Sequence, residues 1–210
     1  METEEESAFT IPMSAWITTL VLVVGVTASV IWILRAPYQH PPAERFVGPG
    51  ACKGCHEKVF AAWSDTRMAN SFDVLRPGRA VEQKEIANLD PEADYTQEES
   101  CVPCHTTGFG LAGGFRSIEE TPEMAGVTCE ACHGPGGSYA GVLMSKTSPN
   151  FATADARAAG LVYPPTATVC RKCHNEGSPF VRADYVFDFT DRVSRGTHEH
   201  LPLKYRHDGG

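Results

Sequence analysis

Four copies of one short motif contain every cysteine in this chain. The motif is Cys-x-x-Cys-His, and its copies begin at Cys52, Cys101, Cys129 and Cys170. The second cysteines are Cys55, Cys104, Cys132 and Cys173, and the histidines that follow them are His56, His105, His133 and His174. This is the attachment signature of a c-type haem, in which two thiols bond to the porphyrin and the histidine supplies the proximal iron ligand. The sequence therefore predicts four covalently attached haem c groups.

Zinc sites and disulfide bonds are the alternatives for paired cysteines. Two Cys-x-x-Cys units commonly form a Cys₄ zinc site, and a disulfide scaffold also uses cysteines in even numbers. Neither alternative requires a histidine directly after each pair, and histidine makes up only 8 of the 210 residues. Four such histidines would arise at random about once in several hundred thousand cases. The pattern therefore favours haem.

A long apolar segment near the N-terminus predicts a membrane anchor. Residues 1–14 form a short tail with four glutamates in its first six residues, and no charged residue follows until Arg35. Residues 15–34 are apolar, and a helix of that length spans about 30 Å, the thickness of the hydrocarbon core. A cleaved signal peptide is the alternative, but the apolar run is long and is preceded by acidic residues. We expect one uncleaved transmembrane helix.

The orientation of this helix follows from the predicted cofactor. The positive-inside rule would place the Arg35 side in the cytoplasm. Covalent haem is attached outside the cytoplasmic membrane, and we take this as the stronger constraint. The expected protein is therefore a single-pass protein of the cytoplasmic membrane, with its N-terminus in the cytoplasm and its haem domain on the periplasmic, extracytoplasmic side.

The rest of the chain is expected to form a proline-rich linker at 35–50 and one tetrahaem cytochrome c domain at 51–210. Four haems in a domain of this size leave little room for a layered protein core, so the haems themselves should dominate it. We expect a compact, mainly α-helical domain with extensive loops.

Local patterns within this domain predict a few further elements. Apolar residues at helical spacing indicate a helix over 53–71, and the charged stretch 76–100 indicates a surface excursion. The glycine-rich segment 108–114 would allow a close approach of the backbone to a haem. Weak alternation makes 185–189 the strand candidate.

Net charge bears on the partners. The formal net charge is −8, which makes nucleic acid an unsuitable partner. A basic docking face on a soluble electron carrier would complement this charge.

Two strings around the second and third motifs resemble a known family. The string CVPCHTTGF begins at Cys101, and GVTCEACHGPG begins at Gly126. Both are similar to the tetrahaem cytochrome c-554 family and its multihaem relatives, over about Gly50 to the last motif. This resemblance implies an electron carrier with closely stacked haems, mostly bis-histidine ligation and one haem that is high-spin in some members.

The chain departs from that family pattern at two positions. Relatives carry a histidine five residues after the tryptophan that follows the first motif, and here Met68 stands five residues after Trp63. Relatives also carry a histidine three residues after CHGPG, where this chain has Tyr139. A thioether ligand would raise a haem potential relative to bis-histidine ligation. Packing beside a porphyrin is the alternative for Met68, and packing or a hydrogen bond at a haem edge is favoured for Tyr139.

The distal iron ligands are sought among residues outside the motifs. Three histidines cluster near the C-terminus, and short His-rich tracts are often metal sites. The candidates in order are Met68, His198, His200 and His207, followed by His40, with Met124 and Met144 in reserve.

The expected function is electron transport rather than catalysis. The chain would relay electrons between a membrane redox complex, either a quinol-oxidising enzyme or a photosynthetic reaction centre, and soluble electron carriers. Two alternatives stay open. One is a multihaem reductase whose open-coordinate haem acts on a small nitrogen or sulfur species. The other is a fixed electron-transfer subunit of a larger membrane assembly.

Overall fold

The computed structural model describes residues 22–27, 29, 44–140, 152–178, 187–195 and 198. The chain divides into two units, Met1–Gln39 and His40–Gly210. In the first unit, residues 22–27 are helical and their side chains are exposed. No helix within the described ranges is long and apolar enough to cross a membrane. Most of the predicted acidic tail and anchor lies outside those ranges.

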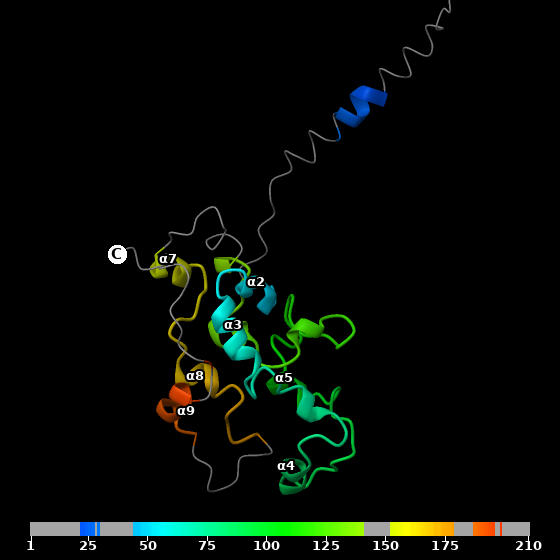
Figure 1. Cartoon of the computed structure of the whole chain (residues 1–210), viewed down its shortest axis with the longest axis vertical. Coiled ribbons are helices and arrows are strands. Elements are labelled where there is room, and N and C mark those ends of the chain that lie inside the picture. The colour runs from blue at the N-terminus through cyan, green and yellow to red at the C-terminus, as the bar shows by residue number, and fades with distance from the viewer. Residues whose placement is uncertain are drawn as a thin grey trace, which may run out of the picture. The chain divides into compact units, whose positions relative to one another are not determined.

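The second unit is built from short helices separated by long loops (Figure 1). Its described helices are α2 (Pro49–Lys53), α3 (Glu57–Ser64), η1 (Asp73–Leu75), α4 (Val81–Ile86), α5 (Val102–His105), η2 (Pro122–Met124), α6 (Cys129–His133), α7 (Thr153–Ala158), α8 (Ala167–Cys170) and α9 (Phe189–Arg195). The longest of them, α3, has 8 residues. Isolated helices this short are marginal in water, so packing and covalent attachment must hold them in place.

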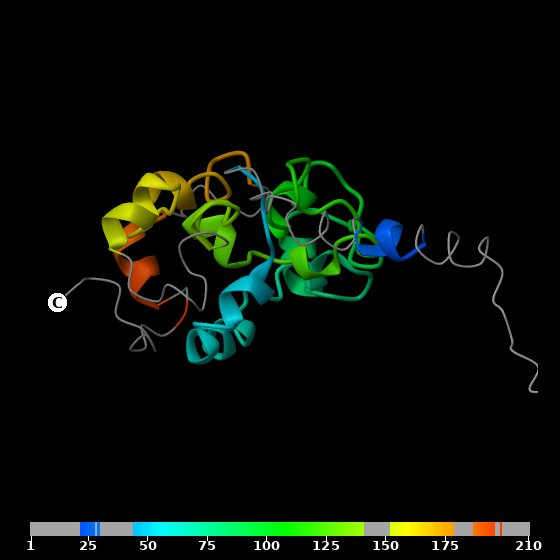
Figure 2. The same cartoon turned by 90° about the horizontal axis from the view of Figure 1, so that it is seen from above.

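The described part of this unit contains no sheet (Figure 2). Its one β-type pairing is an isolated antiparallel bridge between Thr106 and Ala125. The predicted mainly helical, loop-rich fold is thus confirmed.

The helix predicted over 53–71 is shorter than expected. The first motif interrupts it at Cys55 and His56, and α3 ends at Ser64. Beyond α3, the Thr66 hydroxyl donates to the Trp63 carbonyl at 2.7 Å, and the Asn70 amide donates to the Ser64 carbonyl at 3.0 Å. Such side-chain bonds compete with the helical backbone pattern, which explains the early end.

The strand predicted at 185–189 is wrong for the part that the structure describes. Phe187 and Asp188 are irregular, and Phe189 begins α9. The Asp188 carboxylate accepts a hydrogen bond from the Asp191 amide at 3.0 Å, as an N-cap residue does. The capping aspartate outweighs the weak alternation of apolar residues. Tyr185 and Val186 lie outside the described residues.

The apolar core of the described residues is small. Its main cluster of buried side chains consists of Phe46, Phe72, Leu75, Val102, Phe115 and Met124. A second cluster contains Tyr139 and Ala156. Met124, held in reserve as a distal ligand, is 0% exposed within the main cluster.

The end of the predicted linker packs into this unit. Phe46 belongs to the main cluster, and its amide donates to the Ala112 carbonyl at 2.9 Å. The glycine-rich loop does allow a close backbone approach, and its described partner is Phe46. Gly113 has a φ of +75°, and a Cβ there would collide with the Phe46 carbonyl. The folded unit therefore includes residues that the proline content assigned to the linker.

Candidate haem-binding site

Each Cys-x-x-Cys-His motif folds as about one helical turn. In the first motif the His56 amide donates to the Cys52 carbonyl at 2.9 Å, and in the fourth the His174 amide donates to the Cys170 carbonyl at 2.9 Å. The second and third motifs lie in α5 and α6. A helical turn brings residues three and four apart to the same face. This geometry presents two thiols and an imidazole together.

Backbone carbonyls orient two of the motif histidines. His105 Nδ1 lies 2.6 Å from the carbonyl oxygen of Ser71, and His133 Nδ1 lies 3.0 Å from that of Val162. A carbonyl oxygen can only accept, so Nδ1 carries the proton in both rings and donates it. The Nε2 lone pair is then available to a metal, as in most metal-binding histidines.

Burial favours the neutral, metal-binding form of the same side chains. It lowers the pKa of His105 and of His133, although the bond to the backbone carbonyl acts in the opposite direction in each case. The charge of His198 lowers the pKa of His133 further. Burial also lowers the pKa of His174, with a further contribution from Arg192.

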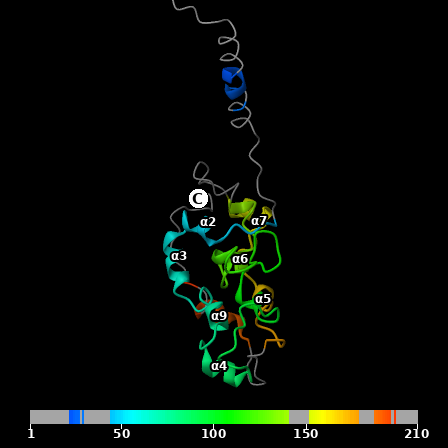
Figure 3. The same cartoon turned by 90° about the vertical axis from the view of Figure 1, so that its right-hand side faces the viewer.

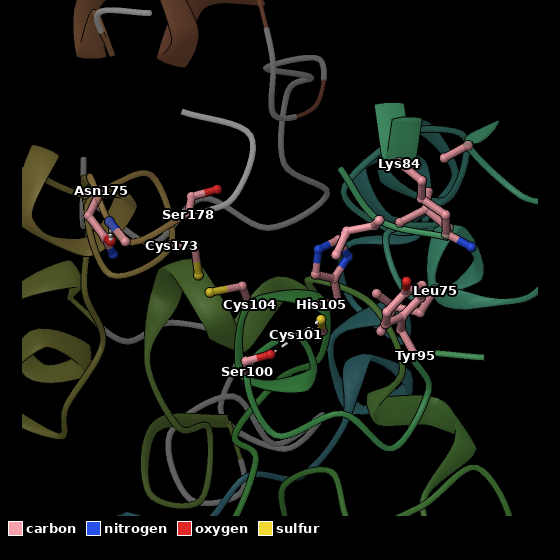
Figure 4. A pocket seen from close by; sticks show the side chains of 14 residues that line it. Leu75, Lys84, Tyr95, Ser100, Cys101, Cys104, His105, Cys173, Asn175 and Ser178 are labelled. Carbon is pink, nitrogen blue, oxygen red and sulfur yellow. Dashed lines mark hydrogen bonds between the residues drawn. The ribbon is translucent and has the colours of Figure 1, made fainter. Parts of the chain in front are cut away.

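Cysteines from different motifs lie next to one another. The thiols of Cys52 and Cys129 lie close enough to shift each other's pKa, upward for Cys52 and downward for Cys129, so the first motif adjoins the third. Burial and the neighbouring Cys104 thiol raise the pKa of Cys173, so the second motif adjoins the fourth, and the sulfur atoms of the two residues point toward each other in Figure 4.

The third and fourth motifs are also neighbours. Burial raises the pKa of the Cys132 thiol to about 11, and the nearby Cys170 contributes to this shift. Helix α6 contacts both α2 and α8, and it lies in the middle of the described unit in Figure 3. The four motifs thus follow one another in space in the order first, third, fourth, second.

A pocket opens beside the second motif (Figure 4). Its walls come from the second motif, from the 74–95 segment and from the residues that follow the fourth motif. The described lining residues are Val74, Leu75, Ala80, Lys84, Leu89, Tyr95, Ser100, Cys101, Cys104, His105, Cys173, Asn175, Gly177 and Ser178. Among them, His105 is the single histidine and there is no methionine.

Lys84 holds one wall of this pocket together. Its side chain is 3% exposed, and its ammonium group donates to the carbonyl of Arg76 at 2.7 Å and to that of Pro91 at 3.3 Å. The same nitrogen lies over the Tyr95 ring, 5.2 Å from the ring centroid. The stretch expected to be a surface excursion therefore contains a buried cation that shapes the pocket.

The residues present fit covalent haem. All eight cysteines are free thiols. Within the described ranges, which include all eight cysteines, no group of three or more His, Cys, Asp or Glu side chains converges as a zinc site would require. The Thr128 hydroxyl, directly before Cys129, is buried without a protein partner, and a bound group or water can satisfy it.

Comparison with known proteins agrees with this chemistry. Residues 51–134 match the family model described as cytochrome c554 and c-prime. The chain is 31% identical over 208 residues to cytochrome c-554 of Nitrosomonas europaea, an alignment that covers 88% of each chain. The chain belongs to the cytochrome c554 family. The solved reduced state of cytochrome c554 from the same organism superposes with a TM-score of 0.68 and 34% identity, covering 79% of this chain and 90% of that one.

Membership of the cytochrome c554 family confirms two predictions. The chain is a multihaem electron-transfer cytochrome, and its cofactors are covalently bound haem c groups at four motifs. The assignment of the motif cysteines as attachment points and of the four motif histidines as proximal ligands stays a prediction from the pattern.

The distal ligand candidates stay predictions. Met68 is half-buried, and its carbonyl accepts a hydrogen bond from the Val127 amide, two residues before Cys129. His198 is half-buried and near enough to His133 to affect its pKa. His40, Met144, His200 and His207 lie outside the described residues.

Tyr139 is 4% exposed, and its hydroxyl donates to the Gly134 carbonyl at 2.6 Å. This contact agrees with the packing and hydrogen-bonding interpretation of Tyr139 rather than with iron ligation. Burial raises the pKa of this hydroxyl above its usual range, so the phenol stays neutral.

Sequence reasoning missed two buried charged residues, Lys84 and Glu130. The sequence does contain a signal for Glu130. Among the residues that lie between the two cysteines of each of the four motifs, Glu130 is the only acidic one. For Lys84 there was none, because lysines in a charged stretch are usually exposed.

Proposed function

We propose that this protein is a membrane-anchored tetrahaem cytochrome c that relays electrons outside the cytoplasmic membrane. The electrons would pass between a membrane redox complex, such as a quinol-oxidising enzyme or a photosynthetic reaction centre, and soluble carriers. Each haem iron can take up and release one electron. The protein's part is to hold the attachment points, orient the ligands and exclude water.

One observation supports the proposed electron relay: each of the four motifs lies next to another in space, so that together they form a continuous series. Cys52 adjoins Cys129, Cys132 lies near Cys170, and Cys173 adjoins Cys104. An electron that enters at one end of such a series has a neighbouring site at every step. An enzyme with a single working haem would not need this continuity.

The relay is tested by counting the electrons that leave each chain. Fully reduced holoprotein is mixed rapidly with excess ferric soluble cytochrome c, and haem absorbance is followed. We expect four electrons per chain to leave in one fast phase. Release of only one or two electrons, with the others trapped, would contradict a connected relay.

The proposed membrane anchor is supported by the apolar segment 15–34. The proposed location is supported by the fact that covalent haem is attached outside the cytoplasmic membrane. N-terminal sequencing of the native protein should find residues ahead of Ala15, and the protein should resist carbonate extraction from membranes. Protease added to intact spheroplasts should remove the haem domain. A start near Pro37 would instead show a cleaved signal peptide, and stable co-purification with other membrane subunits would favour a fixed subunit of an assembly.

A reductase is the second candidate, and the pocket beside His105 favours it. Its described lining offers neither a second histidine nor a methionine to the far side of that site. A small nitrogen or sulfur species could enter there. Steady-state oxidation of the reduced protein by nitrite, hydroxylamine or sulfite would support a reductase, and the absence of turnover with all three would favour the carrier alone.

A further inference from the structure

The carboxylate of Glu130 is buried between the first and third motifs. Glu130 lies in α6, directly after Cys129, and its side chain is 2% exposed. Charged carboxylates are almost never buried without partners, because removing them from water is costly. Its contacts must therefore compensate that cost.

Three backbone amides provide the compensation. Oε1 accepts from the Gly136 amide at 2.6 Å and from the Val47 amide at 3.0 Å, and Oε2 accepts from the Gly48 amide at 2.8 Å. The Val47 amide also lies 3.2 Å from Oε2. Both oxygens act as acceptors from groups that can only donate, and this arrangement suits the ionised carboxylate.

The local backbone is shaped for these contacts. Gly48 has a φ of +82°, a conformation that side chains rarely adopt. A Cβ on Gly136 would lie 3.1 Å from Glu130 Oε1 and 2.8 Å from Val47 Cγ2. Glycine at both positions therefore lets the amides reach the carboxylate.

The charge lies close to the haem attachment points of two motifs. Glu130 adjoins Cys129 in the chain, and the Val47–Gly48 amides that it holds lead directly into α2, which carries Cys52. The carboxylate thus acts electrostatically at the position where the first and third motifs meet.

We propose that Glu130 is a positioning residue whose buried negative charge lowers the reduction potentials of the haems attached at the first and third motifs. One-electron reduction of a ferric haem removes one positive charge from the iron. A nearby carboxylate stabilises the ferric state, and its effect is strong because the site is shielded from solvent. The proposal depends on the covalent haems and not on the membrane anchor or the redox partner.

The test compares two substitutions of Glu130 in the full-length holoprotein, with potentials measured by EPR-monitored redox titration. Glu130→Gln keeps the size and removes the charge. We expect the reduction equilibrium of one or two of the four haems to shift about tenfold toward the ferrous form, a rise of about 59 mV for one electron. Glu130→Asp keeps the charge with a shorter side chain, so its four equilibria should stay within threefold of the parent.

Glu98→Gln is the matched control, because Glu98 is exposed and precedes Cys101 by three residues. Its loss of charge should shift no haem by more than threefold, since solvent screens the exposed carboxylate.

Four results would overturn the proposal. Glu130→Gln could leave every haem within threefold of the parent, or could shift all four equally. Glu130→Asp could shift the potentials as much as Glu130→Gln, which would assign the effect to geometry. Failure of both Glu130 variants to incorporate haem, while Glu98→Gln matures normally, would limit Glu130 to a folding role. If only Glu130→Gln fails to mature, the potentials of Glu130→Asp decide between charge and geometry.

Discussion

The backbone amide of Val127 donates a hydrogen bond to the carbonyl oxygen of Met68 at 2.9 Å. The carbonyl of Val127 in turn accepts from the Trp63 indole at 3.0 Å. These two bonds fasten the turns after α3 to the residues that lead into the third motif. Met68, which stands where relatives carry a ligand histidine, is thereby placed beside a haem attachment site.

We predict that Met68 ligates a haem and makes its potential the highest, or nearly the highest, of the four. The thioether stabilises ferrous iron better than a second imidazole does. Met68→His should keep that haem low-spin and lower its potential, and the other three should change little. Met68→Leu should convert the same haem to high-spin. If redox titration and EPR of both variants match the parent, Met68 only packs.

The C-terminal tract is expected to supply at least one distal ligand. Truncation before Gly196 removes His198, His200 and His207, and should convert at least one low-spin haem to high-spin in the EPR spectrum. Deletion of 208–210 is the control, since it removes none of these histidines. Unchanged low-spin signals after the longer truncation would exclude all three as ligands.

Loss of the Tyr139 hydroxyl should affect stability and not ligation. Tyr139→Phe leaves the half-buried Gly134 carbonyl without the hydrogen bond from the Tyr139 hydroxyl, which costs about 1–2 kcal/mol of unfolding free energy. Denaturant unfolding of the holoprotein measures this change. Tyr163→Phe is the control, because Tyr163 is 54% exposed and its substitution should be nearly neutral. A change of haem spin state in Tyr139→Phe would instead indicate that the phenol acts on the iron.

Lys84 is expected to stabilise the wall of the pocket beside the second motif. Lys84→Met keeps the aliphatic stem but removes the bonds to the Arg76 and Pro91 carbonyls, at a cost of about 2 kcal/mol. The amide of Gly78, which donates to the Pro91 carbonyl at 2.9 Å, should then exchange its hydrogen faster. Lys58→Met, at an exposed position on α3, should leave that exchange unchanged. Equal exchange in both variants would contradict the assigned role.

The chemistry of the site could be predicted from sequence because its determinants are local. Cys129, Cys132 and His133 lie within five residues, and one helical turn is enough to bring them together. The apolar character of 15–34 is equally a property of neighbouring residues, so it predicts an anchor without any tertiary information. The four motifs predicted four haems, and the family resemblance added the role of electron carrier.

Local signals were less reliable for the lengths of elements. The helix predicted over 53–71 ends at Ser64, because Thr66 and Asn70 bond to backbone carbonyls. The capping aspartate Asp188 turned part of a predicted strand into the start of α9. In both cases polar side chains that bond to the backbone outweighed the apolar pattern around them.

Only the tertiary structure decided which distant residues meet. Glu130 binds the amides of Val47 and Gly48, and these contacts span 83 and 82 residues of chain. The thiols of Cys52 and Cys129 likewise come from separate motifs. The sequence determined the four attachment sites, because each is a short-range pattern. The order in which they adjoin, and the buried charge between two of them, depend on long-range packing that no local pattern encodes.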